Sequence, residues 1–383
     1  MHVLILSTNV ASPYVINEGI FFADQAKAFC KYGHNVGYVS VHPVPLMLIL
    51  RKGHQDLGRK EYCLEGVNYL IDSYIKWPKY HLQPMTASLK RGKRLIQAYI
   101  EKFGKPDIIH LHTFDAGLLA IWIKETYSIP YVVTEHSSRF LANSIPNQKV
   151  MDVARATFEN SNLNISVSES FKTAMEQQMN VPFVVIPNIV DTELFTIESF
   201  AKKKTKIISI GRLDNNKNQL LVIEALREVK EKFNNIELII IGKGANDTLL
   251  KNNVRELGLS ENVVFEGFIS RDKIAEIAKT TSLLAITSQH ETFGVVAIEA
   301  MSAGNLVITT PCGGPEKIIS KFGKVSSFNK SKYAQDICQL LNDFSEDQMN
   351  ASRRYAIENF SEEVVVSKLE NVYDSIVQKT KNE

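Results

Sequence analysis

Short, continuous apolar runs alternate with amphipathic segments along the chain, and this alternation constrains the fold more than any other feature. Five runs lie in the first half: HVLIL (2–6), NVGYVSV (35–41), DIIHL (107–111), YVVT (131–134) and FVVIP (183–187). Five more follow: KIISIG (206–211), IELIIIG (236–242), VVFEG (263–267), LLAIT (283–287) and NLVITT (305–310). Amphipathic, helix-like segments lie between them, at 20–33, 216–233, 245–257 and 271–280. Apolar strands separated by helices indicate parallel sheets that are covered on both faces.

Two sets of strands predict two doubly wound α/β domains. The 383 residues are enough for two separate hydrophobic cores. A lysine-rich composition break, ESFAKKKTK at 198–206, marks the region in which we expect the second domain to begin.

Composition excludes several classes of protein. Charged residues make up 22% and hydrophobic residues 44%, which is typical of a soluble globular protein. No apolar run approaches the roughly 20 residues that cross a bilayer. The first residues, MHVLILSTNV, lack the basic segment and cleavage site of a signal peptide. The 4 cysteines are scattered without a CxxC spacing, so we expect reduced core thiols in a cytosolic protein.

Basic residues are concentrated in the segment 41–105, although the net charge of the chain is only +2. This segment holds 12 Lys and Arg against 5 Asp and Glu, and four of its cations, Lys90, Arg91, Lys93 and Arg94, lie in one helix-like stretch. The small total argues against a nucleic-acid partner. Two interpretations stay open: a solvated face, or a surface that contacts anionic lipid or a phosphorylated acceptor.

The loops that follow strands are expected to carry the chemistry, because ligands of doubly wound sheets bind beyond the carboxyl ends of the strands. Arg212 and Lys217 follow one strand and lead into a helix. Two cations beside a helix start suit a diphosphate, although a surface salt bridge is the simpler alternative. After the next strand, Gly242 and Gly244 allow close approach of the backbone to a ligand, but a lone glycine pair is weak evidence.

Two glutamates flank the start of another predicted helix. Glu291 lies in the loop after the strand LLAIT, and Glu299 lies inside the helix that is expected to begin near Phe293. Gly294 allows the first-turn amides to face a ligand. Two carboxylates beside such amides suit the hydroxyl groups of two sugars, as in a nucleotide sugar. The alternatives are a charge favoured by the helix dipole for Glu291 and a surface position for Glu299.

Taken together, these segments resemble the retaining glycosyltransferases of family 4, which have the GT-B architecture of two Rossmann-like domains facing across a cleft. The most specific part is ETFGVVAIE (291–299) with the following AMSAG, which resembles the family's E-x7-E motif. Further matching segments are GRLDNNKN (211–218), VVTEHSS (132–138), VSES (167–170), VIPNIVDTELF (185–195), EGIFFADQAKAFCKYGHNV (18–36) and FSEEVVVSKLENVYDSI (360–376). The resemblance implies an acceptor-side domain at 1–190, a nucleotide-sugar donor domain at 191–360, and a helix at 361–383 that returns to the first domain.

The resemblance also implies a role for each matching residue. Arg212 and Lys217 would bind the diphosphate, and Glu299 would bind the ribose. The transferred sugar and the distal phosphate would be bound by Glu291 and by the amides of Phe293, Gly294 and Val295. The other implied contacts are Phe268 near the base, Gly242 at the donor, Gly19 at the phosphates and His136 at the sugar near the reacting carbon. His136 and Glu291 are the catalytic candidates. The chain departs from the family pattern in having a single glycine at Gly19 and in having Ile189 after Asn188.

The expected reaction is transfer of a hexose or N-acetylhexosamine from a nucleotide sugar, with a UDP-sugar favoured over GDP-mannose. The chain has no Asp-x-Asp, so we expect no metal and no other cofactor. The resemblance implies retention of configuration and a lipid-linked glycan acceptor of bacterial surface polysaccharide or lipopolysaccharide synthesis, at the inner face of the cytoplasmic membrane.

Three alternative functions stay open. A nucleotide-sugar epimerase of GT-B architecture lacks the E-x7-E helix, and a dinucleotide-binding oxidoreductase needs a GxGxxG that LILSTNVASPY does not contain. An inactive GT-B binding subunit is expected to lose charged site residues, whereas Arg212, Lys217, Glu291, Glu299 and His136 are all present.

Overall fold

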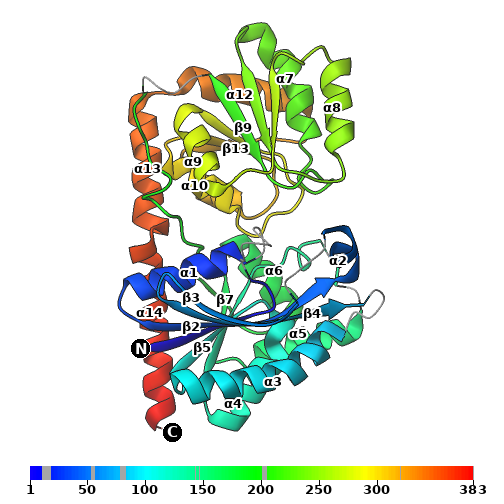
Figure 1. Ribbon diagram of the computed structural model, residues 1–383. Helices are drawn as coiled ribbons and strands as arrows, with labels where there is room; N and C mark the ends of the chain where they lie inside the picture. The colour runs from blue at the N-terminus through cyan, green and yellow to red at the C-terminus, as the bar shows by residue number, and fades with distance from the viewer. Residues whose placement is uncertain are drawn as a thin grey trace. The chain divides into compact units, whose positions relative to one another are not determined.

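The computed structural model describes residues 1–10, 19–52, 57–77, 83–142, 144–145, 147–200, 205–319 and 321–382. The chain divides into two compact units (Figure 1). Unit 1 comprises Met1–Ile189 and Glu362–Glu383, and unit 2 comprises Val190–Ser361. Each unit contains its own sheet.

The sheet of unit 1 has eight strands in the order β3-β4-β2-β1-β5-β6-β7-β8. All neighbours are parallel except the β3–β4 hairpin at one edge. The strands are β1 His2–Ser7, β2 Asn35–Pro45, β3 Gly58–Leu64, β4 Val67–Lys76, β5 Ile108–His112, β6 Tyr131–Glu135, β7 Leu163–Ser166 and β8 Val184–Val185. The helices are α1 Ile20–Lys31, α2 Leu46–Lys52, α3 Gln83–Phe103, the 3₁₀ helix η1 Phe114–Ala116, α4 Gly117–Tyr127, α5 Gln148–Asn160, α6 Glu169–Met179 and α14 Glu362–Asn382.

The sheet of unit 2 is parallel throughout, in the order β11-β10-β9-β12-β13-β14. The strands are β9 Lys206–Ile210, β10 Glu237–Ile241, β11 Val263–Gly267, β12 Leu283–Ile286, β13 Leu306–Thr309 and β14 Gly323–Val325. The helices are α7 Leu220–Lys232, α8 Asp247–Glu256, α9 Arg271–Thr280, α10 Val295–Ser302, α11 Pro315–Ile319, α12 Lys330–Asp343 and α13 Glu346–Phe360. This strand order is that of a Rossmann-like sheet, with its change of direction between β9 and β12.

Helices cover both faces of each sheet (Figure 1), which explains why the central strands are apolar on both sides. Every residue of β5, β6, β12 and β13 is buried. On one face of unit 1, the core combines residues of β1, α1 and α14. The last helix therefore belongs to the core of unit 1, although it follows unit 2 in sequence.

Two predicted helix starts were placed too early. The helix expected from 216 begins at Leu220, because Asn218 has a left-handed backbone (φ 47°). The helix expected from Phe293 begins at Val295, after Gly294 as its N-terminal cap (φ 82°). The predicted strand at 183–187 is reduced to Val184–Val185. The composition break at 198–206 lies partly outside the described residues.

Candidate active site

The order of strands in unit 2 brings two loops together at the carboxyl edge of its sheet. β9 and β12 are neighbours at the point where the strand order changes direction, and ligands of doubly wound sheets bind at such a point. The loop after β9 carries Arg212 and Lys217, and the loop after β12 carries Glu291. The fold therefore places these three predicted residues on adjacent loops.

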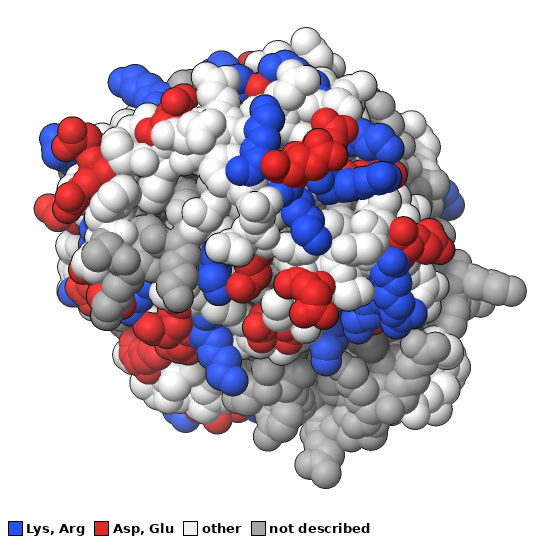
Figure 2. All heavy atoms as spheres, turned by 90° about the horizontal axis from the view of Figure 1, so that it is seen from above, with Lys and Arg blue, Asp and Glu red and all other residues white. Residues whose placement is uncertain are grey.

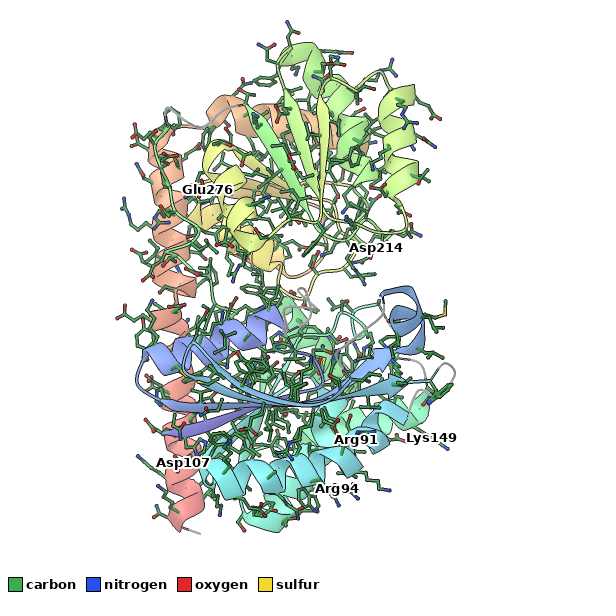
Figure 3. The ribbon with its side chains drawn as sticks, viewed as in Figure 1. Arg91, Arg94, Asp107, Lys149, Asp214 and Glu276 are labelled. Atoms are coloured by element: carbon green, nitrogen blue, oxygen red, sulfur yellow. The ribbon has the colours of Figure 1, made fainter. Side chains whose placement is uncertain are left out.

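Asp214 organises the loop after β9 (labelled in Figure 3). Its Oδ1 accepts a hydrogen bond from the Lys217 amide at 3.0 Å, and its Oδ2 lies 3.0 Å from Arg212 Nη2. The Arg212 side chain is 80% exposed, so its guanidinium is accessible to a ligand. Sequence reasoning did not single out Asp214, although its place two residues after Arg212 is visible in GRLDNN.

Lys217 and Glu291 form an ion pair between the two loops. Lys217 Nζ lies 2.5 Å from Glu291 Oε1, and Ser288 Oγ donates to the same oxygen at 2.6 Å. Thr287 Oγ1 donates to the Lys217 carbonyl at 2.7 Å and fixes the chain on which the lysine lies. Ser288 was not predicted, although its spacing of three residues from Glu291 in SQHE could have indicated it.

The backbone of Glu291 is held by the loop after β13. Its amide donates to the Cys312 carbonyl and its carbonyl accepts from the Gly314 amide, both at 2.8 Å. These bonds place the carboxylate just before Gly294 and the first turn of α10. A Cβ on Gly294 would lie 2.6 Å from Pro315 Cγ, so glycine is required there by space as well as by its backbone angle.

Glu299 is buried rather than on the surface, with 7% of the residue exposed. Its Oε1 accepts from Arg271 Nε and lies close to Arg271 Nη2, both at 2.9 Å. The Arg271 guanidinium also lies over the Phe195 ring, 5.4 Å from its centre. No sequence pattern connects Arg271 with Glu299, because the two residues lie on different helices and are brought together by packing.

The other predicted residues of unit 2 lie on neighbouring segments. Phe268, after β11, is 38% exposed. Phe293 is buried, and Val295 opens α10. Gly242, after β10, has φ 145°, and a Cβ there would lie 1.8 Å from the Gly211 carbonyl oxygen. Gly242 therefore has a packing role against the loop that carries Arg212.

Gly19 and His136 belong to unit 1, not to the cluster in unit 2. Gly19 caps the start of α1 with φ 76°. His136 follows β6, and its Nε2 lies 3.0 Å from His112 Nδ1 on β5. Burial lowers the pKa of His136 to about 3, so the ring is neutral at physiological pH and can exchange hydrogen bonds without carrying charge.

The basic segment 41–105 is partly neutralised within unit 1. Arg91 and Arg94 lie on α3 (Figure 3), and Arg91 pairs with Asp72 at 3.0 Å. Lys102 pairs with Glu61, and Lys93 Nζ lies 4.9 Å from the centre of the Trp122 ring. Lys90 and Arg94 are exposed. Figure 2 is seen from above and does not look onto α3; on the face that it shows, acidic and basic side chains are interspersed.

Two features are absent from the described part of the chain. None of its helices combines the length and apolarity needed to cross a bilayer. Nor does it contain a group of three His, Cys, Asp or Glu residues arranged to hold a metal ion.

Two protein-family descriptions match consecutive parts of the chain. Glycosyltransferase Family 4 matches residues 20–194, and Glycosyl transferases group 1 matches residues 190–362. The chain belongs to glycosyltransferase family 4. An uncharacterized glycosyltransferase of Methanocaldococcus jannaschii is 26% identical over 88% of this chain and 94% of its own length. The phosphatidyl-myo-inositol mannosyltransferase of Mycobacterium leprae is 25% identical over 71% of this chain and 74% of its own length.

Solved structures share the fold of this glycosyltransferase. Sucrose-phosphate synthase from Thermosynechococcus elongatus superposes with a TM-score of 0.79 at 18% identity, over 99% of both chains. HepE of Anabaena, in complex with UDP and glucose, gives a TM-score of 0.70 at 19% identity, over 98% of this chain and 100% of its own. The glycosyltransferase therefore has the GT-B fold that its sequence predicts.

Proposed function

We propose that this glycosyltransferase transfers a hexose or N-acetylhexosamine from a nucleotide sugar to an acceptor hydroxyl, with retention of configuration and without a metal ion. The observation that carries the proposal is the convergence of Lys217 and Ser288 on Glu291, just before the first turn of α10. A cation, a carboxylate and free helix amides suit a ligand that has both phosphates and hydroxyls.

In the proposed reaction, the bond from the anomeric carbon to the diphosphate oxygen breaks and a bond to the acceptor oxygen forms on the same face. Lys217 exchanges Glu291 for a phosphate, and Arg212 adds a second cation, so the leaving diphosphate is stabilised by charge. Glu291 then accepts hydrogen bonds from the sugar, whose ring gains positive charge in the transition state. The acceptor proton passes to a phosphate oxygen of the leaving group.

Glu299 is assigned to the ribose, with Phe268 near the base. The amides of Phe293, Gly294 and Val295 are assigned to the sugar and distal phosphate, and Gly19 and His136 are the contributions of unit 1.

A UDP-sugar is the favoured donor. HepE, which shares the fold, was solved with UDP and with UDP-glucose. GDP-mannose is the second candidate, because a relative from Caenorhabditis elegans that is 28% identical over 51% of this chain is named as a GDP-Man mannosyltransferase. We propose a lipid-linked glycan acceptor in bacterial surface polysaccharide synthesis, used at the cytoplasmic face of the membrane. The phosphatidyl-myo-inositol mannosyltransferase relatives are named for a lipid acceptor.

A thermal-shift panel of UDP-glucose, UDP-N-acetylglucosamine, GDP-mannose and ADP-glucose tests donor binding. A donor at 100 times its Kd stabilises the folded protein by about 2.7 kcal/mol, so we expect one nucleotide series to raise the Tm. If no nucleotide sugar raises the Tm, the donor assignment is wrong.

Turnover separates an enzyme from an inactive binding subunit. With the donor found in the panel, we expect acceptor-dependent release of nucleoside diphosphate that is unchanged by EDTA, and a product whose anomeric coupling constant matches that of the donor. Loss of activity in EDTA that Mg²⁺ restores would disprove metal independence. Donor binding without any release would favour a binding subunit.

A further inference from the structure

A buried carboxylate lies directly beside His136. Glu135 is the last residue of β6, and none of it is exposed to solvent. Among the described residues it forms no ion pair, because the nearby Arg139 is paired with Asp115 at 2.8 Å. A buried carboxylate needs hydrogen-bond donors to offset the loss of water, so its donors indicate its role.

The hydrogen-bond donors to Glu135 in the described part of the chain are backbone amides. Oε1 accepts from the His136 amide at 3.0 Å and from the Ser137 amide at 2.8 Å. Oε2 accepts from the Phe114 amide at 3.0 Å. Phe114 begins η1, which follows β5, so one carboxylate joins the chain after β5 to the chain after β6.

The ring of His136 contacts a histidine at the end of the neighbouring strand, β5. His112, the last residue of β5, places its Nδ1 3.0 Å from His136 Nε2. The His112 ring stacks on Phe22 and on His110, with 4.3 Å between ring centres in each case. Glu135 therefore fixes the backbone of His136, and the ring of His136 contacts His112, which lies two residues before the Phe114 amide that Glu135 also binds.

We propose that Glu135 is a positioning residue, whose ionised carboxylate holds His136 in place for sugar transfer. The inference rests on the proposed function in one respect, namely that His136 contacts the donor. Three amides need two accepting oxygens, and a protonated carboxyl has an O–H in place of one acceptor. The ionised form is therefore the form that holds all three.

The surroundings of Glu135 shift its pKa into a pH range in which a titration can be measured. The pKa of the Glu135 carboxyl is raised to about 7, mainly because the group is buried. Asp115 also favours a higher pKa, whereas the amides of Ser137 and Phe114 and the charge of Arg139 favour a lower one. His112 and His136 face the same region, but burial lowers the pKa of both rings, so they stay neutral. As the pH rises through about 7, Glu135 should ionise and its hydrogen bonds to the backbone of His136 should become stronger.

Amide NMR of the whole chain tests the contact without any substrate. Between pH 5.5 and 8.5, we expect the amide resonances of Phe114, His136 and Ser137 to shift together with one apparent pKa. Glu135→Gln should abolish this common titration. If the three amides do not titrate together in the wild-type protein, the proposal is wrong. This result does not require the variant to fold.

Hydrolysis of UDP-glucose, followed as UDP release, tests the consequence for turnover. Misplacing His136 should lower the kcat of Glu135→Gln by roughly tenfold to a hundredfold, with the Kd for UDP unchanged. Wild-type kcat should rise with pH through about 7, and this rise should be absent in the variant. The matched control is Asn147→Ala, which removes another side-chain bond to a backbone amide of unit 1, that of Val150 at 3.1 Å, and should leave kcat and its pH profile unchanged.

The outcomes separate the two proposals. An unchanged kcat in Glu135→Gln, or a fall in kcat that matches a fall in UDP affinity and Tm, overturns the positioning role. Absence of binding of every donor in the panel, together with amides that titrate, overturns the proposed function while supporting the contact between Glu135 and the backbone of His136.

Discussion

Glu291 and Glu299 carry the same side chain in different surroundings. Glu291 contacts a lysine and a serine that come from two loops, whereas Glu299 is buried and held by an arginine. Glu291 can therefore change partner when a ligand arrives at the loops, and Glu299 is fixed in advance by Arg271. This difference supports different roles in the proposed reaction.

Replacing each of the two glutamates by glutamine should change different kinetic constants. Glu299→Gln should mainly raise the donor KM, because a ribose contact is equally strong in the ground state and the transition state. Glu291→Gln should lower kcat by about a hundredfold, on the order of 2.7 kcal/mol, because its contact strengthens as the sugar ring gains charge. Steady-state kinetics measure both values. Glu276→Gln, at an exposed position of α9 (Figure 3), is the matched control. If both variants lose only donor affinity, Glu291 is a binding residue.

The two cations of the loop after β9 should contribute to nucleotide affinity. Lys217→Ala or Arg212→Ala should weaken UDP binding by about 1.5–3 kcal/mol, the range for hydrogen bonds to charged groups. Calorimetric titration with UDP measures the change. Lys206→Ala is the control, because Lys206 begins β9, at the opposite end of the strand, and pairs with Glu237. An equal loss of UDP affinity in all three variants would show that the net charge of the protein, and not a contact of Lys217 or Arg212 with UDP, causes the effect.

The sequence was sufficient to place the site residues on loops, but not to find their partners. Arg212, Lys217 and Glu291 could be located because each follows an apolar strand, and parallel strands end at a common edge. The Arg271–Glu299 pair could not be predicted from the sequence, because it depends on how α9 packs beside α10. Glu135 is part of the matching segment VVTEHSS, but nothing in that segment indicates that its side chain is fully buried.

Among the elements, the central strands were predictable and the edges were not. Continuous apolar runs identify strands that are buried on both faces. β3 is a mostly exposed edge strand with the sequence GRKEYCL, and β14 has only three residues, so neither shows such a run. The start of α10 was misplaced by two residues, because the apolar pattern begins at Phe293 before the backbone becomes helical.

The histidines of β5 and its neighbourhood should make unit 1 sensitive to acid. Burial lowers the pKa of His110 and His136 to about 3 and that of His112 well below 6.5. Between these values the unfolded chain binds more protons than the folded one, so stability should fall as the pH falls below about 6.5. Glu135 has the opposite effect on stability, because its raised pKa lets the folded state bind a proton that the unfolded state does not bind. This single proton offsets only part of the effect of the three histidines.

Urea unfolding at pH 5 and pH 7.5 measures this effect. The 2 tryptophans, Trp77 and Trp122, both lie in unit 1, so their fluorescence reports that unit alone. A midpoint at pH 5 equal to or above that at pH 7.5 would contradict the prediction. His112→Phe, which removes one of the three titrating rings, should reduce the dependence on pH if the variant folds.

At the scale of the whole molecule, α14 is the element whose removal should matter most for unit 1. Its buried residues in the core of that unit are Val365, Val366, Leu369, Tyr373 and Val377. Their burial contributes on the order of 10 kcal/mol, which is comparable with the entire stability of a typical domain. A variant that ends at Ser361 should therefore lose the cooperative tryptophan transition of unit 1 and retain UDP binding by unit 2. A variant that ends at Gln378 keeps all five residues and should unfold like the wild-type protein. A normal tryptophan transition in the shorter variant would contradict this account.

Vesicle binding tests whether the basic segment 41–105 contacts membrane. We expect the protein to sediment with vesicles that contain anionic lipid, and to be released as salt screens the attraction. The exposed pair Lys90→Glu and Arg94→Glu should weaken sedimentation, whereas Arg227→Glu and Arg255→Glu, exposed in unit 2, should not. Equal binding to neutral vesicles, or none to either kind, would identify the segment as a solvated face.

The position of α14 has a consequence for the order of folding during synthesis. The ion pair between Lys31 and Glu362 joins residues that are 331 apart in the chain, and all of unit 2 is translated between them. When the ribosome has released residues up to Ser361, unit 2 has its complete sequence, but unit 1 still lacks its final helix. Most of unit 1 is therefore synthesised before unit 2 but completed after it, and the apolar surface that α14 covers is the part of the nascent protein that a chaperone would need to protect.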